Sequence, residues 1–371
     1  MKKIVFFISF ICLVIACSSS EDSNDPIPSS YDKTALLTNW ADNIIIPSFE
    51  NYQAKVNVLS ANVASFTSNP SEENLVTIRN SWLEAYKAFQ YVAMYNIGKA
   101  EELTFKESTN TYPANATQIN VNITSGSYNL TQNSQFDRQG FPGLDYLING
   151  LASTDAGITA FYTTDALANN RKQYLTAVTA RLKSHADAVT NDWKTVYRTT
   201  FVSNTGNSVS GSINKMTNNF IKSFEKDVRA GKVGIPAGLF SNGVKYPEKV
   251  EAYYKNNVSK ELLNTAIKAS QDFYNGKHFN SATTGESLKS YLNYLNAVRS
   301  GQKLSDIIEN QFATIITSNN TLNNSLSQQI IEDNSKTIAA YNVMQQQVVY
   351  LKLDMMQALN ISIDYVDGDG D

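Results

Sequence analysis

Apolar residues recur along this chain at the spacing of one helical face. One set comprises Leu75, Ile78, Trp82, Ala85, Phe89 and Val92, which are separated by alternating steps of three and four residues. A second set repeats the rhythm and comprises Tyr341, Met344, Val348, Leu351, Met355 and Ala358. A stripe of this kind favours helices that pack side by side at a shallow angle. The spacing therefore predicts an all-α fold.

The first two helices have recognisable boundaries. A helix is expected from Lys33 to Phe66, and Pro47 is expected to kink or restart it, because proline has no backbone N–H to donate. Ser71, just after Pro70, is suited to cap the next helix. Glu72 and Glu73 follow at its positive end, which favours their charges.

Two more helices are expected in the middle of the chain. The segment from Asn169 to Thr199 has an apolar face made of Tyr174, Val178, Leu182, His185, Val189, Trp193 and Val196. A fourth helix runs from about Ser210 to Ala230. Between residues 118 and 128, Ile119, Val121 and Ile123 alternate with polar residues. This alternation predicts an irregular excursion, such as a short hairpin.

A glycine-rich stretch from Gly231 to Tyr246 separates two helical blocks. The first block covers about residues 33–235 and the second covers 236–360, and each is the size of a helical bundle. Residues 361–371 form an acidic tail. The expected organisation is therefore two bundle-like halves.

The N-terminus has the pattern of a lipoprotein signal peptide. Lys2 and Lys3 precede an apolar run that is too short to span a membrane, and Val14-Ile15-Ala16-Cys17 resembles a lipobox. Residues 1–16 are expected to be removed, and Cys17 is expected to carry the lipid. The polar, acidic tether at 17–32 resembles that of Bacteroidetes lipoproteins. These features predict lipid anchoring in the outer membrane, facing either the cell surface or the periplasm.

Cysteine content and charge exclude several classes of function. Cys12 lies in the signal segment and Cys17 is the lipidation site, so the mature chain has no disulfide, thiolate zinc site or cysteine nucleophile. The net charge of −3 becomes −5 when Lys2 and Lys3 are removed, since residues 1–16 contain no acid. An acidic chain without a basic stripe argues against nucleic acid as a partner.

The most specific motif lies around Gly140. The segment reads Gln139-Gly140-Phe141-Pro142-Gly143-Leu144-Asp145-Tyr146-Leu147. It resembles the Gly-x-His-x-x-Glu signature of the imelysin-like proteins. Gly140 matches this signature, but Pro142 stands at the His position and Asp145 at the Glu position. Proline has no imidazole nitrogen to offer a metal, so this position lacks the ligand on which the description of the family as metallopeptidases rests.

Other segments are similar to imelysin-like proteins in order and spacing. They are residues 40–49, 82–89, 96–98, 218–221, 225–236, 253–254, 273–276 and the ending 364–371. The resemblance implies two bundle-like helical halves, with the signature near their interface. It also implies a surface or periplasmic role that is often linked to iron uptake.

The candidate site is a cleft around the signature. Its expected residues are Gly140, Phe141, Pro142, Gly143, Asp145, Tyr146, Trp82, Arg138, Glu225 and Arg229. Asp145 is expected in the first turn of a helix, where the dipole favours a negative charge. It is either a metal ligand or general base, or a structural carboxylate paired with a cation such as Arg138 or Arg229. The structural role is favoured, because a single carboxylate is weak evidence for a site.

Few residues could hold a metal ion. His185 lies on an apolar helical face and His278 is expected in solvent, so zinc is disfavoured. Carboxylates suit calcium or ferric iron better, and these are the candidate ions, although no cofactor is certain. The acidic tail resembles the opening of a calcium loop without its final Glu. Its candidate ligands are Asp364, Asp367, Asp369 and Asp371.

Aromatic residues gather around the second predicted helix. They are Trp82, Tyr86, Phe89, Tyr91 and Tyr95. Residues at this spacing most often belong to the core, and the alternative is the wall of a ligand cleft or a haem face.

Three functions remain open on the sequence. The preferred one is a non-catalytic envelope lipoprotein that binds an iron species, a haem-like ligand or a protein partner in the cleft between the halves. The alternative is a divergent metallopeptidase that uses Asp145 and other carboxylates as ligands. The third is a structural or adhesive surface module with a vestigial cleft.

Overall fold

The computed structural model describes residues 30–365. The chain divides after Tyr31, and the unit from Asp32 to Asp371 contains all the elements described below. The predicted signal peptide, Cys17 and the tail residues Asp367, Asp369 and Asp371 lie outside the described residues. The described part is mainly helical, with one pair of two-residue strands, which confirms the predicted all-α fold.

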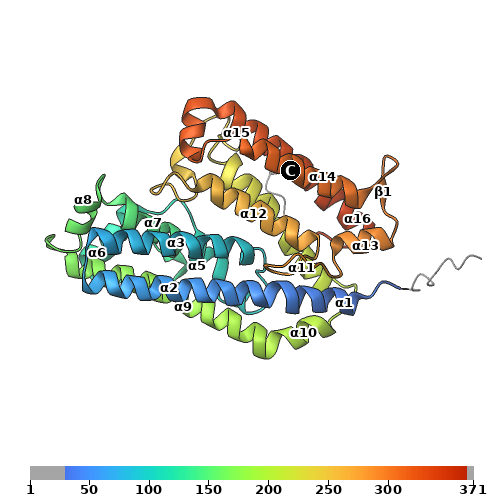
Figure 1. Ribbon diagram of the computed structural model, residues 1–371, viewed down its shortest axis with the longest axis horizontal. Coiled ribbons are helices and arrows are strands. Elements are labelled where there is room, and N and C mark those ends of the chain that lie inside the picture. Colours follow the sequence, from blue (N-terminus) through green and yellow to red (C-terminus); the bar gives the residue numbers. More distant parts are fainter. Residues whose placement is uncertain (1–29, 366–371) are drawn as a thin grey trace, which may run out of the picture. The chain divides into compact units, whose positions relative to one another are not determined.

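The first half is built around three long helices. They are α2 (Ile46–Ser68), α3 (Glu72–Val92) and α9 (Ala168–Asp192), and α2 packs against both of the others (Figure 1). α1 (Lys33–Thr38) and the π-helix η1 (Asn39–Ile45) lead directly into α2. After α9, the π-helix η4 (Trp193–Tyr197) continues into α10 (Arg198–Ser203).

Shorter helices connect α3 to α9. They are α4 (Lys99–Glu102), α5 (Phe105–Asn110), α6 (Ala116–Ser125), the 3-10 helix η2 (Asn133–Arg138), α7 (Gly140–Asp145), the π-helix η3 (Tyr146–Gly150) and α8 (Asp155–Ala160). α11 (Ser212–Lys222) and the π-helix η5 (Ser223–Gly234) then lead towards the second half. η5 packs against α12 (Ser259–Tyr274) and α15 (Leu326–Val348), so it already belongs spatially to the second set of helices.

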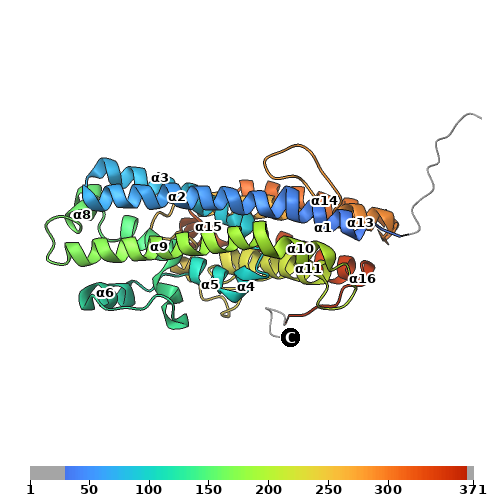
Figure 2. The same cartoon turned by 90° about the horizontal axis from the view of Figure 1, so that it is seen from below.

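The second half surrounds α12, α14 (Leu304–Asn320) and α15. α14 packs on both of the others, and α12 also contacts α3 and so joins the two sets. The remaining elements are the 3-10 helix η6 (Pro247–Lys249), α13 (Leu288–Tyr294), the antiparallel pair β1 (Val298–Arg299) and β2 (Gln302–Lys303), the π-helix η7 (Val349–Met355) and α16 (Met356–Ala358). Figure 2 shows α2 and α3 side by side, with α9 next to them.

Pro47 does not break the first helix, but the helix changes type just before it. The π-helix η1 ends at Ile45 and α2 restarts at Ile46. Pro47 cannot donate to the carbonyl of Asn43, and that carbonyl instead accepts from the N–H of Phe279 at 2.8 Å. The carbonyl to which Pro47 cannot donate thus joins this helix to the segment around Phe279.

The expected start and apolar face of α3 are confirmed. The Ser71 hydroxyl accepts from the N–H of Asn74, and Glu72 and Glu73 lie in the first turn. The six periodic apolar residues between Leu75 and Val92 are all buried. They place one whole side of α3 in the core.

Two sequence expectations were wrong. Residues 118–128 do not form an irregular excursion, because most of them belong to α6, where Ile119 and Ile123 share a buried face and Val121 is exposed. Val196 was expected on the apolar face of its helix and is also exposed. It lies in η4, where the wider π turn shifts the later residues off the stripe.

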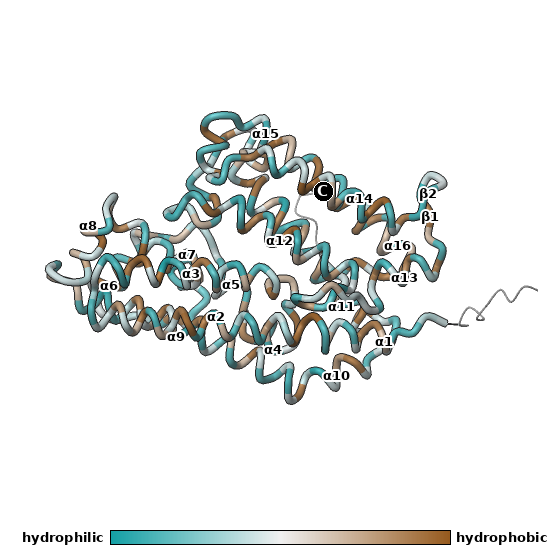
Figure 3. The backbone as a smooth tube through the Cα atoms, in the orientation of Figure 1, coloured by the Kyte–Doolittle hydropathy of each residue, from teal (hydrophilic) through white to brown (hydrophobic). Residues whose placement is uncertain are grey.

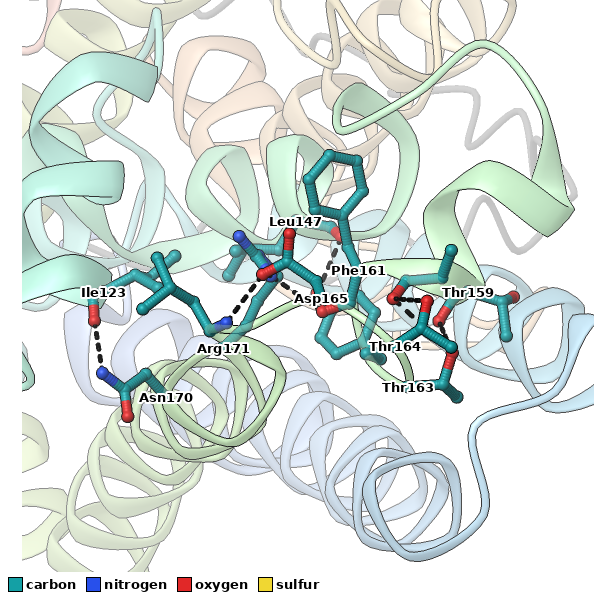
Figure 4. Close-up of polar contacts among 12 residues, drawn as sticks. Ile123, Leu147, Thr159, Phe161, Thr163, Thr164, Asp165, Asn170 and Arg171 are labelled. Atoms are coloured by element: carbon teal, nitrogen blue, oxygen red, sulfur yellow. Dashed lines mark hydrogen bonds and ion pairs between the residues drawn. The ribbon is translucent and has the colours of Figure 1, made fainter.

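The start of α9 is fastened to its neighbours by polar contacts (Figure 4). The Arg171 guanidinium donates to the carbonyl of Phe161 at 2.7 Å and to Asp165 at 3.1 Å. Asn170 donates to the carbonyl of Ile123 in α6. Through Tyr162, which donates to the carbonyl of Leu147 at 2.8 Å, the same region also holds η3 in place.

Hydrophobic residues recur along the helices and do not form long continuous blocks (Figure 3). Within the described residues, no helix combines the length and the apolar character needed to cross a membrane.

Candidate functional site

The signature forms a short helix whose first residue has to be glycine. Gly140 has a φ of 69°, and a Cβ atom there would lie 2.2 Å from the carbonyl oxygen of Thr109. Both the backbone conformation and this contact exclude a side chain. Pro142 follows in the first turn of α7, where its missing N–H costs no helical hydrogen bond.

Phe141 connects the signature to α3. Its carbonyl accepts from the indole N–H of Trp82 at 3.1 Å, and its ring stacks on Tyr86 with centroids 4.4 Å apart. Both partners are fully buried, as are Phe89 and Tyr95. These four aromatic residues therefore belong to the core, as the spacing predicted, and Tyr91 is half-buried at its edge.

Asp145 joins the signature helix to a loop of the second half. One carboxylate oxygen accepts from the N–H of Tyr254 at 2.9 Å. The other accepts from the N–H of Lys255 at 2.9 Å and from the side-chain amide of Asn149 at 3.0 Å. The ring of Tyr146 packs against Tyr254 beside them. The signature therefore contacts the loop that precedes α12.

The expected surroundings of Asp145 were wrong in two respects. Asp145 is the last residue of α7 and not a member of its first turn. None of its hydrogen bonds involves Arg138 or Arg229. Arg138 pairs with Asp137 at 3.5 Å, and Arg229 lies in a different buried network. Backbone amides, which leave no trace in the sequence, take the place of the expected cation.

The electrostatics of Asp145 reflect this choice of partners. The side chain is 1% exposed. Burial raises the pKa of Asp145 from 3.8 to about 7, while the hydrogen bonds from Tyr254, Asn149 and Lys255 lower it by less. The nearby charge of Lys255 also lowers it slightly, but Asp145 forms no ion pair among the described residues, and its carboxyl titrates near neutral pH.

A second buried carboxylate, Glu251, lies on the same loop. It accepts from the ammonium group of Lys232, from Asn110 at 2.8 Å and from Gln90 at 3.4 Å. Asn110 in turn accepts from the Tyr86 hydroxyl. The network therefore joins α3, α5 and η5 to the loop that Asp145 also holds.

Glu225 and Arg229 form a separate network on η5. Glu225 accepts from Lys352 at 2.9 Å and from the Tyr365 hydroxyl at 2.8 Å. Arg229 donates to the Tyr341 hydroxyl at 2.7 Å. The structure does not bring these two predicted cleft residues to Asp145, because Arg229 bonds to Tyr341 of α15 and Glu225 bonds to Lys352 of η7.

Two neighbouring pockets lie near the signature, and signature residues line only the smaller one. The larger one has a volume of about 370 Å³ and is lined from α3, α5, η5, η6 and α12, and so from both halves. The smaller one, of about 210 Å³, is lined by Pro142 and Asp145 together with Val250, Tyr253 and other residues. Tyr112 and Pro113 line both pockets and separate them.

The donor groups at the signature do not fit a metal ion. The side chain of Pro142 has no donor atom for a metal, and three N–H groups already occupy the Asp145 carboxylate. Across residues 30–365, no three His, Cys, Asp or Glu side chains are arranged to hold a metal ion. A zinc peptidase needs such a set to bind and activate water.

The remaining candidate ligands are dispersed. His185 is a core residue whose Nδ1 lies 3.0 Å from the Ser108 hydroxyl, and burial lowers its pKa to about 4. His278 is half-buried beside Tyr91 and Tyr95, not fully solvated as expected. The backbone N–H of Asp364 donates to the side-chain oxygen of Asn218 at 3.1 Å. The other candidate calcium ligands, Asp367, Asp369 and Asp371, lie outside the described residues.

Sequence reasoning missed Glu251 and the lysines of the larger pocket. The sequence contains a weak indication of Lys232, since this residue continues the helical spacing of Glu225 and Arg229. No pattern in the sequence indicates Glu251, because its partners come from three distant elements.

Proteins of known structure share this architecture. A crystal structure of an imelysin-like protein from Psychrobacter arcticum superimposes with a TM-score of 0.68 at 16% identity, covering 90% of this chain and 97% of that one. A Parabacteroides distasonis protein described as an iron-regulated protein A precursor superimposes with a TM-score of 0.70 at 15% identity and the same coverage. No curated protein sequence matches this chain. The family model described as Imelysin, Peptidase M75, matches residues 45–354. With that match over most of its length, the chain belongs to the imelysin family.

Proposed function

We propose that this protein is a non-catalytic binding protein of the cell envelope, which takes an iron species into the larger pocket between its two halves. One observation carries the proposal. The signature residues are committed to structural contacts, whereas the pocket beside them is open and lined from both halves. Ligand sites commonly occupy such interfaces, and a volume of about 370 Å³ lies within their usual range.

The envelope location rests on the sequence. The charged start, the short apolar run and the lipobox at Cys17 support export and lipid anchoring. Iron as the cargo is supported by the relative from Parabacteroides distasonis, which is described as iron-regulated. The inference to this chain is ours.

A divergent metallopeptidase is the second candidate, and the titration of Asp145 favours it. A carboxyl with a pKa of about 7 is suited to act as a general base. Against this role stand the burial of Asp145, its three N–H partners and the lack of further ligands among the described residues. We therefore rank it below binding.

Calorimetric titration of the purified full chain in mild detergent, with ferric citrate and with haemin, tests the proposal. Ala93→Trp fills the larger pocket, and Ala64→Trp, at an exposed site on α2, is the matched control. We expect an iron ligand to bind the wild type and the control but not Ala93→Trp. Equal binding by all three proteins would show that the iron ligand does not bind in this pocket.

A peptide library incubated with the same protein and added zinc tests the alternative. No cleavage is expected. Zinc-dependent cleavage that disappears in Asp145→Asn would establish the peptidase and refute the non-catalytic proposal.

A further inference from the structure

The larger pocket has an excess of positive charge. Lys106 from α5, Lys226 and Lys232 from η5, and Lys249 from η6 line it, whereas Glu107 and Asp227 are its only lining carboxylates among the described residues. The chain as a whole has a net charge of −3. The positive lining is therefore a local feature of this pocket, and it opposes the average charge of the protein.

Two of the four lysines are neutralised by partners. Lys106 contacts both oxygens of Asp227 at 3.1 Å. Lys232 is buried and paired with Glu251. These two ion pairs position the walls of the pocket. Of the lining charges that remain, Lys226 and Lys249 outnumber the carboxylate of Glu107 by one.

Lys226 and Lys249 are held by aromatic rings and not by carboxylates. The Lys226 ammonium lies 5.7 Å from the centroid of the Tyr365 ring, and that of Lys249 lies 4.0 Å from the Tyr246 ring. Within residues 30–365, neither lysine forms an ion pair. A ring positions an ammonium group without using its N–H donors, which stay available to a ligand.

The same pocket has no donor set for a bare iron ion. The described residues contain no cluster of His, Cys, Asp and Glu that could coordinate one. Lysine ammonium groups repel a free cation but bind carboxylate oxygens through charge-assisted hydrogen bonds. Phe89, Met94 and Val228 supply an apolar wall, and a ligand seated there would exclude water and strengthen those bonds.

Building on the proposed function, we infer that the pocket takes iron as a small anionic carboxylate chelate. The chelate's own oxygens surround the metal, and its outer carboxylates face Lys226 and Lys249. The protein then recognises the chelate and forms no bond to the iron itself. This identifies the ligand class by its charge, and such binding needs no metal ligand at the position of the signature His.

The test titrates ferric citrate, gallium citrate and ferrous sulfate into the purified full chain in mild detergent. The double variant Lys226→Gln with Lys249→Gln removes the two free charges. Its matched control is Lys245→Gln with Lys303→Gln, which makes the same change in net charge at exposed positions away from the pocket. Circular dichroism verifies that all the variants are folded.

We expect both citrate chelates to bind the wild type with an affinity that falls as salt is added. The pocket variant should bind about tenfold more weakly or worse, while the control stays within about twofold. Undiminished affinity of the pocket variant, or binding of ferrous sulfate without citrate, would overturn the inference.

The two proposals fail in different ways. If Ala93→Trp abolishes chelate binding but the lysine variant retains it, the pocket is still the binding site. The inference that lysine charge recognises the chelate is then refuted. Haemin binding that depends on Ala93, without any citrate binding, likewise keeps the proposed function and refutes the anionic chelate. Binding that ignores Ala93→Trp refutes the site itself.

Discussion

Replacing Asp145 by Asn should remove a specific pH dependence from the stability of this protein. The carboxyl is 1% exposed, and its pKa is raised from 3.8 to about 7, chiefly by burial. The folded state therefore binds this proton more tightly than the unfolded state does. The stability from this group is fully present below pH 3.8 and is lost as the pH rises through 7.

The magnitude follows from the shift. A displacement of about three pH units, at about 1.4 kcal/mol per unit, corresponds to about 4 kcal/mol of unfolding free energy. The slope between about pH 4.5 and 6.5 should approach about −1.4 kcal/mol per pH unit for this single group. The amide that replaces the carboxyl in the Asp145→Asn variant cannot titrate. The wild-type curve should therefore fall relative to the variant curve by a few kcal/mol across this range.

The assay is urea unfolding followed by circular dichroism at about pH 4.5, 5.5, 6.5 and 7.5. The difference between wild type and variant is the quantity to read, because His185 titrates in the opposite sense. Its lowered pKa of about 4 makes stability fall as the pH drops, and this term is common to both proteins. Asp306→Asn, at an exposed position on α14, controls for net charge.

A difference that stays constant across this pH range would refute the reasoning, because Asp145 would then have the same pKa in both states. A wild type that gains stability over the variant as the pH rises would show that the amides of Tyr254 and Lys255 outweigh burial. Either outcome would also remove the basis for Asp145 as a general base.

Three further outcomes are expected from the geometry. Lys232→Met leaves the buried Glu251 carboxylate without its cation and should cost about 3–5 kcal/mol in urea unfolding, and most of this should return when Glu251→Gln is added. Gly140→Ala should lower the melting temperature and cost at least about 2 kcal/mol of unfolding free energy. The backbone at Gly140 is left-handed, and the added methyl group would clash with the carbonyl of Thr109. An unchanged melting temperature would contradict the packing of α7. Pro142→His restores the motif residue but should give no stoichiometric zinc by elemental analysis, because three N–H groups occupy Asp145 and no three His, Cys, Asp or Glu side chains of the described residues are arranged to hold a metal ion. Stoichiometric zinc in this variant would contradict that assignment of the donor groups.

Local patterns predicted much of the fold. The apolar residues of α3 repeat every three or four positions, and Ser71 marks its start, so its extent and buried face are both readable along the sequence. The signature around Gly140 indicated the family, which the match over residues 45–354 confirms. Where the pattern misled, the reason was also local. Ile119 and Ile123 satisfy both alternation and a helical step of four, and the alternating interpretation was the wrong choice.

The sequence by itself determined that this protein is helical, that the segment around Gly140 resembles the imelysin signature, and that Pro142 stands where that signature has His. The tertiary structure alone decided what Asp145 does, because its partners are backbone amides 109 and 110 residues away. It also decided that lysines from three separate elements line one pocket. Helix formation depends on neighbours within a few residues, so periodicity records it. Polar contacts between distant elements depend on how helices cross, and no repeating pattern in the chain encodes that.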